Sequence, residues 1–291
     1  MTSSQVRLLP IGLGLIIVAA FLAAANQLPT LGAGGLLHPA RRRVEAMPPE
    51  GCRDVKLAGV GVELAAWSCS ASGRRRGTLV YLHGIADNRA SSAGAIRRFV
   101  PLGLDVVAYD SRAHGDSGGD VCTYGFFEKQ DLRRILDTVA AGPILLLGTS
   151  LGAAVALQAA ADDVRVSGVV AAEPFSDLRT VATERAPFVF TASAIARAFQ
   201  LAERQGQFQV DAVSPVAAAA QITAPVLLIH GDADVDTSPD HSRRVFAMLQ
   251  GPKRLVLIPG AGHNGSLRAE TWDQIERWVV DVLDRPGLTP F

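Results

Sequence analysis

Residues 144–160 read ILLLGTSLGAAVALQAA, and this stretch decides the fold class. A short apolar run, Ile144 to Leu147, leads directly into Gly148-Thr149-Ser150-Leu151-Gly152, and an alanine-rich helical pattern follows without a gap. A G-x-S-x-G segment between a strand and a helix is a sharp turn that exposes the serine hydroxyl. The turn crowds the positions two before and two after the serine, so glycine is needed there. This setting predicts that Ser150 is a nucleophile.

A second segment, Gly115-Asp116-Ser117-Gly118-Gly119, has the same pattern. It lies in a polar loop with no strand directly before it, and it resembles the nucleophile motif of trypsin-like proteases. Those proteases are all-β and usually rich in disulfides, and their serine comes last in the triad. This chain has three cysteines and alternates strands with helices. We therefore assign the nucleophile to Ser150 and not to Ser117.

Short apolar runs alternate with helical patterns from Val55 onward. Runs of this length, apolar on both faces, are typical of a buried parallel sheet, and the alternation predicts a doubly wound α/β fold with helices on both faces of a twisted, mostly parallel sheet. The expected strands are a hairpin at 55–67 and single strands at 78–82, 105–109, 144–147, 166–172, 225–229 and 254–258; the expected helices are 90–100, 128–141, 151–161, 239–249 and 268–283.

One stretch interrupts this alternation. Residues 175–222 contain helical patterns, the clearest at 192–205, but no convincing strand. A single crossover does not need so many residues. The insertion begins after a strand end, where ligand sites of α/β sheets lie, which favours a helical lid over a substrate site. The alternative is an extra structural helix pair with no role in binding.

A serine nucleophile needs a base, and three histidines follow Ser150. His263 lies in a glycine-rich loop between the last strand and the last helix, from which an imidazole can reach back over the sheet. His230 ends a strand and is expected to be structural. His241 lies in a helical pattern and is expected to be solvated. The sequence therefore favours His263 as the base.

The acid that orients this base has several candidates. The strand that ends at His230 is followed by Asp232, Asp234 and Asp236, and all three can orient His263. Glu173, at the end of the strand before the insertion, is an alternative.

Several motifs occur together in residues 55–284: the Ser150 pentapeptide, the order Ser150, Asp234, His263, and the segments Tyr81-Leu82-His83-Gly84 and Asp110-Ser111-Arg112-Ala113-His114-Gly115-Asp116-Ser117. With these motifs the chain resembles the α/β-hydrolase superfamily. Within it, the chain most resembles bacterial serine hydrolases of the α/β-hydrolase-domain and serine aminopeptidase-like groups. In this family the acid follows the strand as His-Gly-x-x-Asp, which selects Asp234. Ala113 replaces a family glycine, and this departure concerns loop geometry.

The resemblance also implies an oxyanion hole formed by the N–H groups of Leu151 and Ile85. It implies a carboxylic-ester hydrolase that forms an acyl-enzyme on Ser150, acts on small or lipid-like acyl substrates, and needs no cofactor and no metal. A peptidase or an acyltransferase on the same triad is the alternative enzyme. A catalytically inactive, membrane-tethered binding protein is the alternative of a different class.

The N-terminal 40 residues are expected to lie outside the hydrolase domain, which is assigned to residues 41–291. The apolar run from Leu8 to Ala25 is compatible with a signal peptide or with an uncleaved membrane anchor. Arg41, Arg42 and Arg43 complicate both interpretations, because positive charge tends to stay in the cytoplasm. We expect an exported or membrane-anchored protein, with its orientation open.

The composition argues against a nucleic-acid partner and leaves two possible states for the cysteines. The chain of 291 residues carries no formal net charge, and its sequence shows no basic face, so nucleic-acid binding has no electrostatic support. Cys52 and Cys69 flank the predicted hairpin and can pair in an oxidising compartment; the alternative is that these two and Cys122 are free thiols. Oligomeric state is left open.

Overall fold

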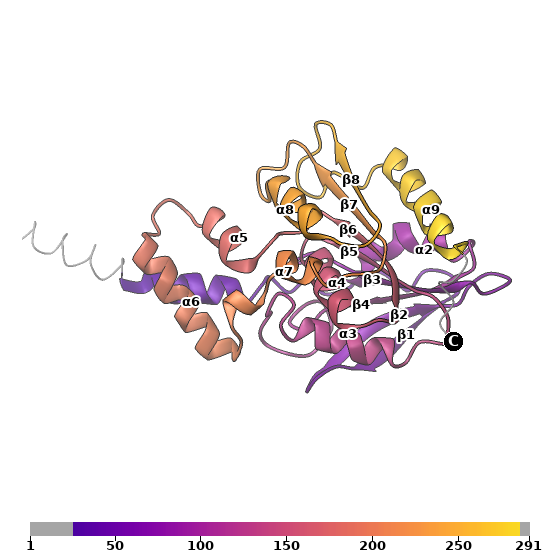
Figure 1. Ribbon diagram of the computed structural model, residues 1–291. Helices are drawn as coiled ribbons and strands as arrows, with labels where there is room; N and C mark the ends of the chain where they lie inside the picture. The colour runs from indigo at the N-terminus through magenta and orange to yellow at the C-terminus, as the bar shows by residue number, and fades with distance from the viewer. Residues whose placement is uncertain (1–25, 286–291) are drawn as a thin grey trace, which may run out of the picture.

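A computed structural model describes residues 26–285 and contains one eight-stranded sheet in the order β1-β2-β4-β3-β5-β6-β7-β8 (Figure 1). The two pairs formed by β2, with β1 and with β4, are antiparallel, and all the others are parallel, which confirms the predicted mostly parallel sheet. The strands are β1 (Cys52–Ala58), β2 (Glu63–Cys69), β3 (Gly77–Leu82), β4 (Leu104–Tyr109), β5 (Ile144–Thr149), β6 (Val166–Ala172), β7 (Val226–Gly231) and β8 (Lys253–Ile258).

Helices cover both faces of this sheet. The helices of the main alternation are α2 (Ala93–Phe99), preceded by the 3-10 turn η1 (Arg89–Ser92), α3 (Glu128–Leu136), α4 (Leu151–Asp162), α8 (Asp240–Met248) and α9 (Ala269–Leu283). Alternate residues of one strand point to opposite faces. Leu145 and Leu147 of β5 accordingly join the core under α2 and α9, whereas Leu146 joins the core under α3 and α4.

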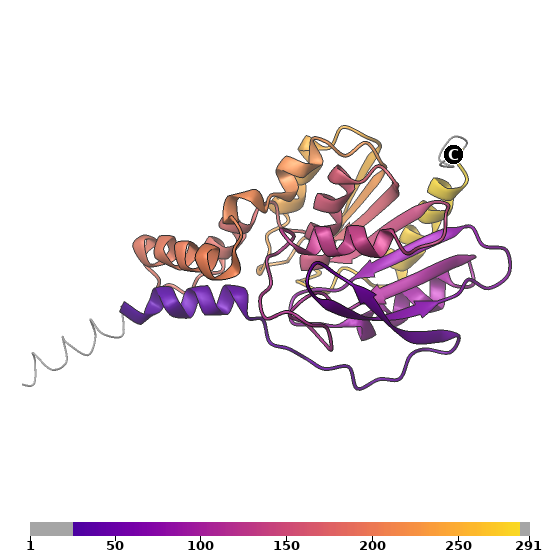
Figure 2. The same cartoon turned by 90° about the horizontal axis from the view of Figure 1, so that it is seen from below.

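The insertion between β6 and β7 is helical, as predicted. It contains α5 (Leu178–Glu184), α6 (Ala192–Gly206), the 3-10 turn η2 (Val210–Ala212) and α7 (Pro215–Ala219). In Figures 1 and 2, α5 and α6 project from one side of the sheet-containing body.

The N-terminal side of the chain departs from the prediction. Residues 26–37 are helical and lie along α6 (Figure 2). Ala33 and Leu37 are fully buried in the larger core, and a Cβ on Gly32 would lie 3.0 Å from the Cβ of Ala198 in α6. Placing the fold boundary at residue 40 was therefore wrong for this segment, because burial of its apolar face fastens it to the insertion.

The predicted membrane segment falls outside the described residues. The apolar run from Leu8 to Ala25 lies wholly before them. Within residues 26–285, no helix combines the length and the apolar character that a bilayer crossing requires.

The cysteines take two different states. Cys52 and Cys69 form a disulfide that joins β1 to β2, so of the two alternatives for this pair the structure has the disulfide. Cys122 is buried, and its burial raises the pKa of the thiol.

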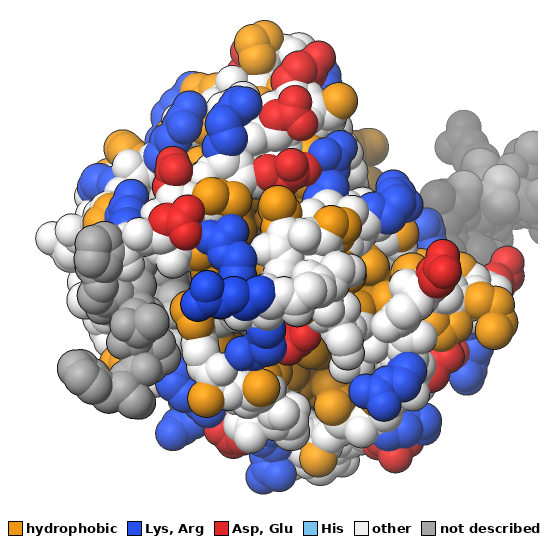
Figure 3. Space-filling view, turned by 90° about the vertical axis from the view of Figure 1, so that its right-hand side faces the viewer, with side chains coloured by type: hydrophobic (Ala, Val, Ile, Leu, Met, Phe, Trp, Pro, Cys, Tyr) orange, Lys and Arg blue, Asp and Glu red, His pale blue; other side chains and the backbone are white. Residues whose placement is uncertain are grey.

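The surface of the described residues shows no segregation of charge on the face drawn in Figure 3, where basic and acidic side chains are interspersed with apolar ones.

Candidate active site

Ser150 occupies a strained turn between β5 and α4. Its φ of +48° and ψ of −110° lie in a region that side-chain-bearing residues rarely adopt. A Cβ on Gly148 would lie 2.3 Å from the carbonyl oxygen of Gly152, and a Cβ on Gly152 would lie 2.1 Å from that of Leu82. The predicted need for glycine at both positions is therefore a matter of direct backbone contact.

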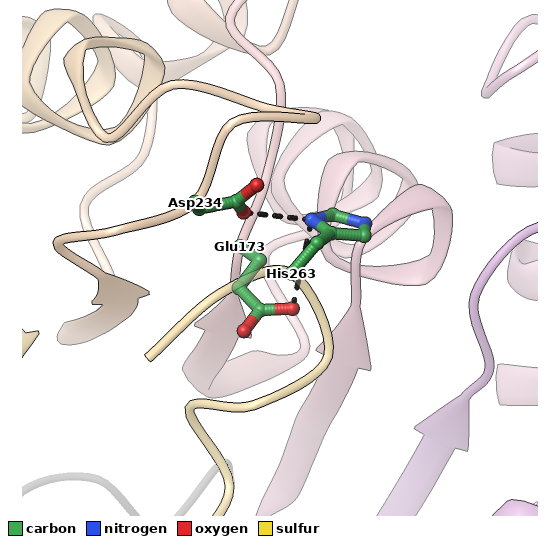
Figure 4. A group of neighbouring side chains, drawn as sticks. All are labelled: Glu173, Asp234 and His263. Atoms are coloured by element: carbon green, nitrogen blue, oxygen red, sulfur yellow. Dashed lines mark hydrogen bonds and ion pairs between the residues drawn. The ribbon is translucent and has the colours of Figure 1, made fainter. Parts of the chain in front are cut away.

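The structure brings the three predicted side chains into one hydrogen-bonded chain. The Ser150 hydroxyl lies 3.0 Å from Nε2 of His263, and Nδ1 of His263 lies 2.7 Å from Oδ2 of Asp234. Asp234 is an acceptor at Nδ1, which assigns the ring proton to that nitrogen and leaves Nε2 free to accept from the hydroxyl. Figure 4 shows Asp234 and Glu173 on the Nδ1 side of the ring. This is the arrangement in which an imidazole can take the proton of a serine as it attacks.

Asp234 is held in place by its surroundings. Its Oδ1 accepts hydrogen bonds from the N–H groups of Asp236 (3.0 Å) and Thr237 (2.9 Å). Its Oδ2 lies 3.2 Å from Nε2 of His230. Burial lowers the pKa of His230, so this imidazole is neutral and its Nε2–H donates mainly to the Thr237 carbonyl, at 2.8 Å. His230 is thus structural, as predicted.

The other acid candidates have different partners. Asp232 accepts from the N–H of Gly260 at 2.7 Å, and Asp236 contacts Asp234 through its own backbone. Glu173 is buried, and its carboxylate accepts from the N–H groups of Asn264 (2.6 Å) and Ser266 (3.1 Å). Its nearer oxygen is 3.8 Å from Nδ1 of His263, so Glu173 positions the histidine loop and Asp234 makes the hydrogen bond.

These same three side chains are close enough together to suggest a cation site. Donor atoms of Glu173, Asp234 and His263 lie within 4.8 Å of one another. Each of these atoms is already engaged: the Glu173 oxygens accept from backbone amides, and His263 joins Asp234 to Ser150. The donor set therefore suits proton transfer better than metal binding.

A cavity of about 850 Å³ opens over Ser150 and His263. Ile85 lines it, and Leu151 follows Ser150 as the first residue of α4. Among the residues that the structure describes, no protein group accepts a hydrogen bond from the N–H of either one. The cavity also contains two arginines that the sequence patterns did not single out as site residues, Arg42 and Arg185.

The remaining sequence candidates lie outside this chain of hydrogen bonds. The Ser117 hydroxyl is buried, donates to the Asp110 carbonyl at 2.6 Å and accepts from the Ala65 N–H at 2.9 Å. His241, expected to be solvated, is fully buried between the body and α5. Its Nε2 lies 2.8 Å from Oε2 of Glu184, and the Ser176 N–H donates to its Nδ1 at 3.0 Å. The expectation for His241 was wrong because α5 covers this side of α8, which the helical pattern alone does not reveal.

The model of the alpha/beta hydrolase family matches residues 79–278, more than half of the chain. The chain belongs to the α/β-hydrolase family. An uncharacterized protein of Bacillus subtilis, YqkD, is 30% identical over 196 residues, which are 64% of this chain and 64%, just under two thirds, of the relative. An uncharacterized protein of Escherichia coli, YfhR, is 24% identical over 234 residues, 77% of each chain.

Solved structures agree on the fold of this α/β-hydrolase. A Pyrococcus furiosus esterase superposes with a TM-score of 0.66 at 22% identity and covers 85% of this chain and 98% of its own. An acetyl xylan esterase from Paenibacillus superposes with a TM-score of 0.65 at 20% identity, covering 90% and 93%. At such identities the likeness extends to the arrangement of strands and helices, which here carries Ser150, Asp234 and His263 on the ends of β5, β7 and β8.

Proposed function

We propose that this α/β-hydrolase cleaves carboxylic esters through a Ser150-His263-Asp234 triad. The observation that carries the proposal is the continuous hydrogen-bond chain from the Ser150 hydroxyl through His263 to Asp234. The strained turn beneath it fixes the hydroxyl at the wall of the cavity. The esterases with the same fold add support for an ester as the substrate.

Two chemical steps follow from this arrangement. Ser150 Oγ forms a bond to the ester carbonyl carbon while its proton moves to Nε2 of His263, and Asp234 stabilises the resulting imidazolium. The C–O bond to the alcohol then breaks, and His263 returns the proton to the leaving alkoxide. Water, activated by His263, releases the acid and restores Ser150.

The oxyanion of each tetrahedral intermediate is assigned to the N–H groups of Ile85 and Leu151. Both amides have no protein acceptor within the described residues, and the Leu151 amide lies at the N-terminus of α4, where the helix dipole favours negative charge. Each such donor contributes on the order of 3 kcal/mol to transition-state stabilisation.

Turnover of p-nitrophenyl esters and of aminoacyl-anilides tests the proposal. We expect wild type to hydrolyse at least one ester much faster than any anilide, and Ser150→Ala to lose that activity. A protein that cleaves anilides in preference to esters would be a peptidase on the same triad. Wild type that equals Ser150→Ala on every substrate would contradict the enzymatic proposal and favour a binding protein.

We also propose that the catalytic domain functions outside the cytoplasm. The Cys52–Cys69 disulfide supports this, since such bonds persist in oxidising compartments, as does the apolar run before residue 26. Fusion of residues 1–50 to alkaline phosphatase, which is active only after export, tests the localisation. We expect an active fusion; an inactive, stably produced fusion would contradict export.

A further inference from the structure

A second cavity, of about 420 Å³, lies between the helical segment 26–37, α5 and α6. Figure 2 shows this helical segment alongside α6, in the part of the molecule that projects from the body. Its walls are almost entirely apolar and include Leu36 from the N-terminal segment, Leu178 and Val181 from α5, and Ile195 and Phe199 from α6.

The polar groups at this cavity have partners inside the protein. The Tyr124 hydroxyl donates to the Leu36 carbonyl at 3.0 Å. The Arg185 side chain donates to the Asp236 carbonyl at 2.7 Å and to the Thr237 hydroxyl. A ligand here therefore gains little from hydrogen bonding, and the walls suit an aliphatic chain.

Arg185 lies between this apolar cavity and the catalytic one, because it lines both. Helix α5 turns Val181 and Ala182 toward the apolar cavity, and Glu184 beside Arg185 toward the cavity of Ser150. The guanidinium of Arg185 is fastened to the loop that carries Asp234. A chain whose carbonyl lies at Ser150 would therefore pass the aliphatic stem of Arg185 to enter the apolar cavity.

Large apolar side chains are also exposed beside this cavity. Leu31, which lines it, is 65% exposed. Phe188 and Val189, in the loop that joins α5 to α6, are 99% and 50% exposed. Large apolar side chains exposed beside an apolar cavity are typical of an interaction site for an apolar ligand or surface.

We infer that the apolar cavity binds the aliphatic acyl chain of the ester whose carbonyl reacts with Ser150. The inference rests on the proposed function, and it makes the helical segment 26–37 a determinant of substrate specificity. Each methylene transferred from water into the cavity should raise kcat/KM by about fourfold. The substrates are therefore esters of medium or long fatty acids.

Two adjacent glycines provide a matched test. Gly35 lines the cavity and lies one turn after Leu31 on the same face of its helix. Gly34 is not among the lining residues, and a Cβ at either glycine meets nothing within 4 Å. Gly35→Phe should therefore fill the cavity mouth, whereas Gly34→Phe makes the same change of helix propensity away from it.

The measurement is kcat/KM for p-nitrophenyl acetate, butyrate, octanoate and dodecanoate. We expect wild type and Gly34→Phe to prefer the longer chains. Gly35→Phe should lose at least tenfold on dodecanoate and stay within twofold of wild type on acetate, which also shows that it folds. Ala182→Phe, from the α5 wall, should repeat the Gly35→Phe pattern.

Hydrolysis of acetate with no gain for longer chains, or equal losses in Gly34→Phe and Gly35→Phe, would overturn the cavity assignment and leave the proposed function standing. No hydrolysis of any ester by wild type would contradict the proposed function, and with it the cavity assignment. If Gly35→Phe leaves kcat/KM unchanged for every ester but changes the molar mass measured by light scattering, the cavity binds a second copy of the chain. That result would overturn the inference.

Discussion

Two segments of this chain share the pattern G-x-S-x-G but differ in everything around it. Ser150 lies between a buried strand and a helix, with its hydroxyl on His263 and at a cavity wall. Ser117 lies in a loop, and its hydroxyl donates to the Asp110 carbonyl and accepts from the Ala65 N–H. The pentapeptide therefore identifies a nucleophile only together with the strand before it, the helix after it and the hydrogen-bond partners of its serine.

The largest expected difference between the two serines is in catalysis. Ser150→Ala should lower kcat/KM for a good ester by at least about 10⁴-fold, because a triad without its nucleophile retains only binding and oxyanion stabilisation. Ser117→Ala, assayed at a temperature where it remains folded, should stay within a few-fold of wild type. Comparable losses of kcat/KM in both variants would contradict the assignment of catalysis to Ser150 alone.

The next effect concerns the acid that supports Ser150 through His263. Asp234→Asn should lower kcat by roughly 10³- to 10⁴-fold, because the amide no longer favours the productive tautomer of the imidazole. Asp232→Asn is the matched control, since its side-chain oxygen can still accept from the Gly260 N–H. The assignment of Asp234 fails if the Asp232 variant is the more damaged of the two.

Ser117 should contribute to stability instead. Ser117→Ala removes one hydrogen bond to the Asp110 carbonyl and one from the Ala65 N–H, both buried. Leaving such groups unpaired costs about 1–3 kcal/mol each, so the free energy of unfolding should fall by roughly 2–6 kcal/mol. Denaturant unfolding measures this loss. The Ser150→Ala variant should lose much less unfolding free energy, because the hydroxyl's side-chain partner, His263, lies at the cavity.

The smallest effect is the pH dependence of stability near Ser117. His114, whose carbonyl accepts from the Ser117 N–H, is fully buried, and burial lowers its pKa to about 4 from 6.5. Between these values the unfolded chain binds more protons than the folded one, so the free energy of unfolding falls as the pH drops. From pH 7 to pH 5, His114 alone accounts for about 1–2 kcal/mol of that loss.

The control for this prediction is His114→Asn, whose amide can replace the hydrogen bond from Nδ1 to the Arg112 carbonyl. Its unfolding free energy should fall less steeply over the same pH interval, as measured in denaturant at each pH. An unchanged slope would mean that His114 is not buried in its neutral form.

Much of the fold and of the site follows from local sequence, because the signals are local. Apolar runs predict β3 to β8, and the turn at Ser150 needs glycine on both sides for reasons internal to the turn. Position along the chain also selects His263 as the base among the three histidines that follow Ser150. The acid is harder, because Asp232, Asp234 and Asp236 follow one strand, and only the folded loops show which carboxylate meets the imidazole. The family resemblance selected Asp234, and the structure places that residue against His263.

What local sequence could not predict depends on packing between distant segments. The burial of His241 is set by α5, and the helical segment 26–37 is held by α6, more than 150 residues away. The apolar cavity exists only because these pieces meet. The arginines of that cavity and of the catalytic one are likewise brought there by loops whose patterns carry no signal.

The most direct test of the central claim is covalent labelling with a fluorophosphonate, which reacts with an activated serine hydroxyl. Tryptic digestion and mass spectrometry then locate the adduct. We expect stoichiometric labelling of Ser150, loss of this labelling in His263→Ala, and no labelling of Ser117. Labelling of Ser117 with Ser150 spared would contradict the assignment of Ser150 as the nucleophile.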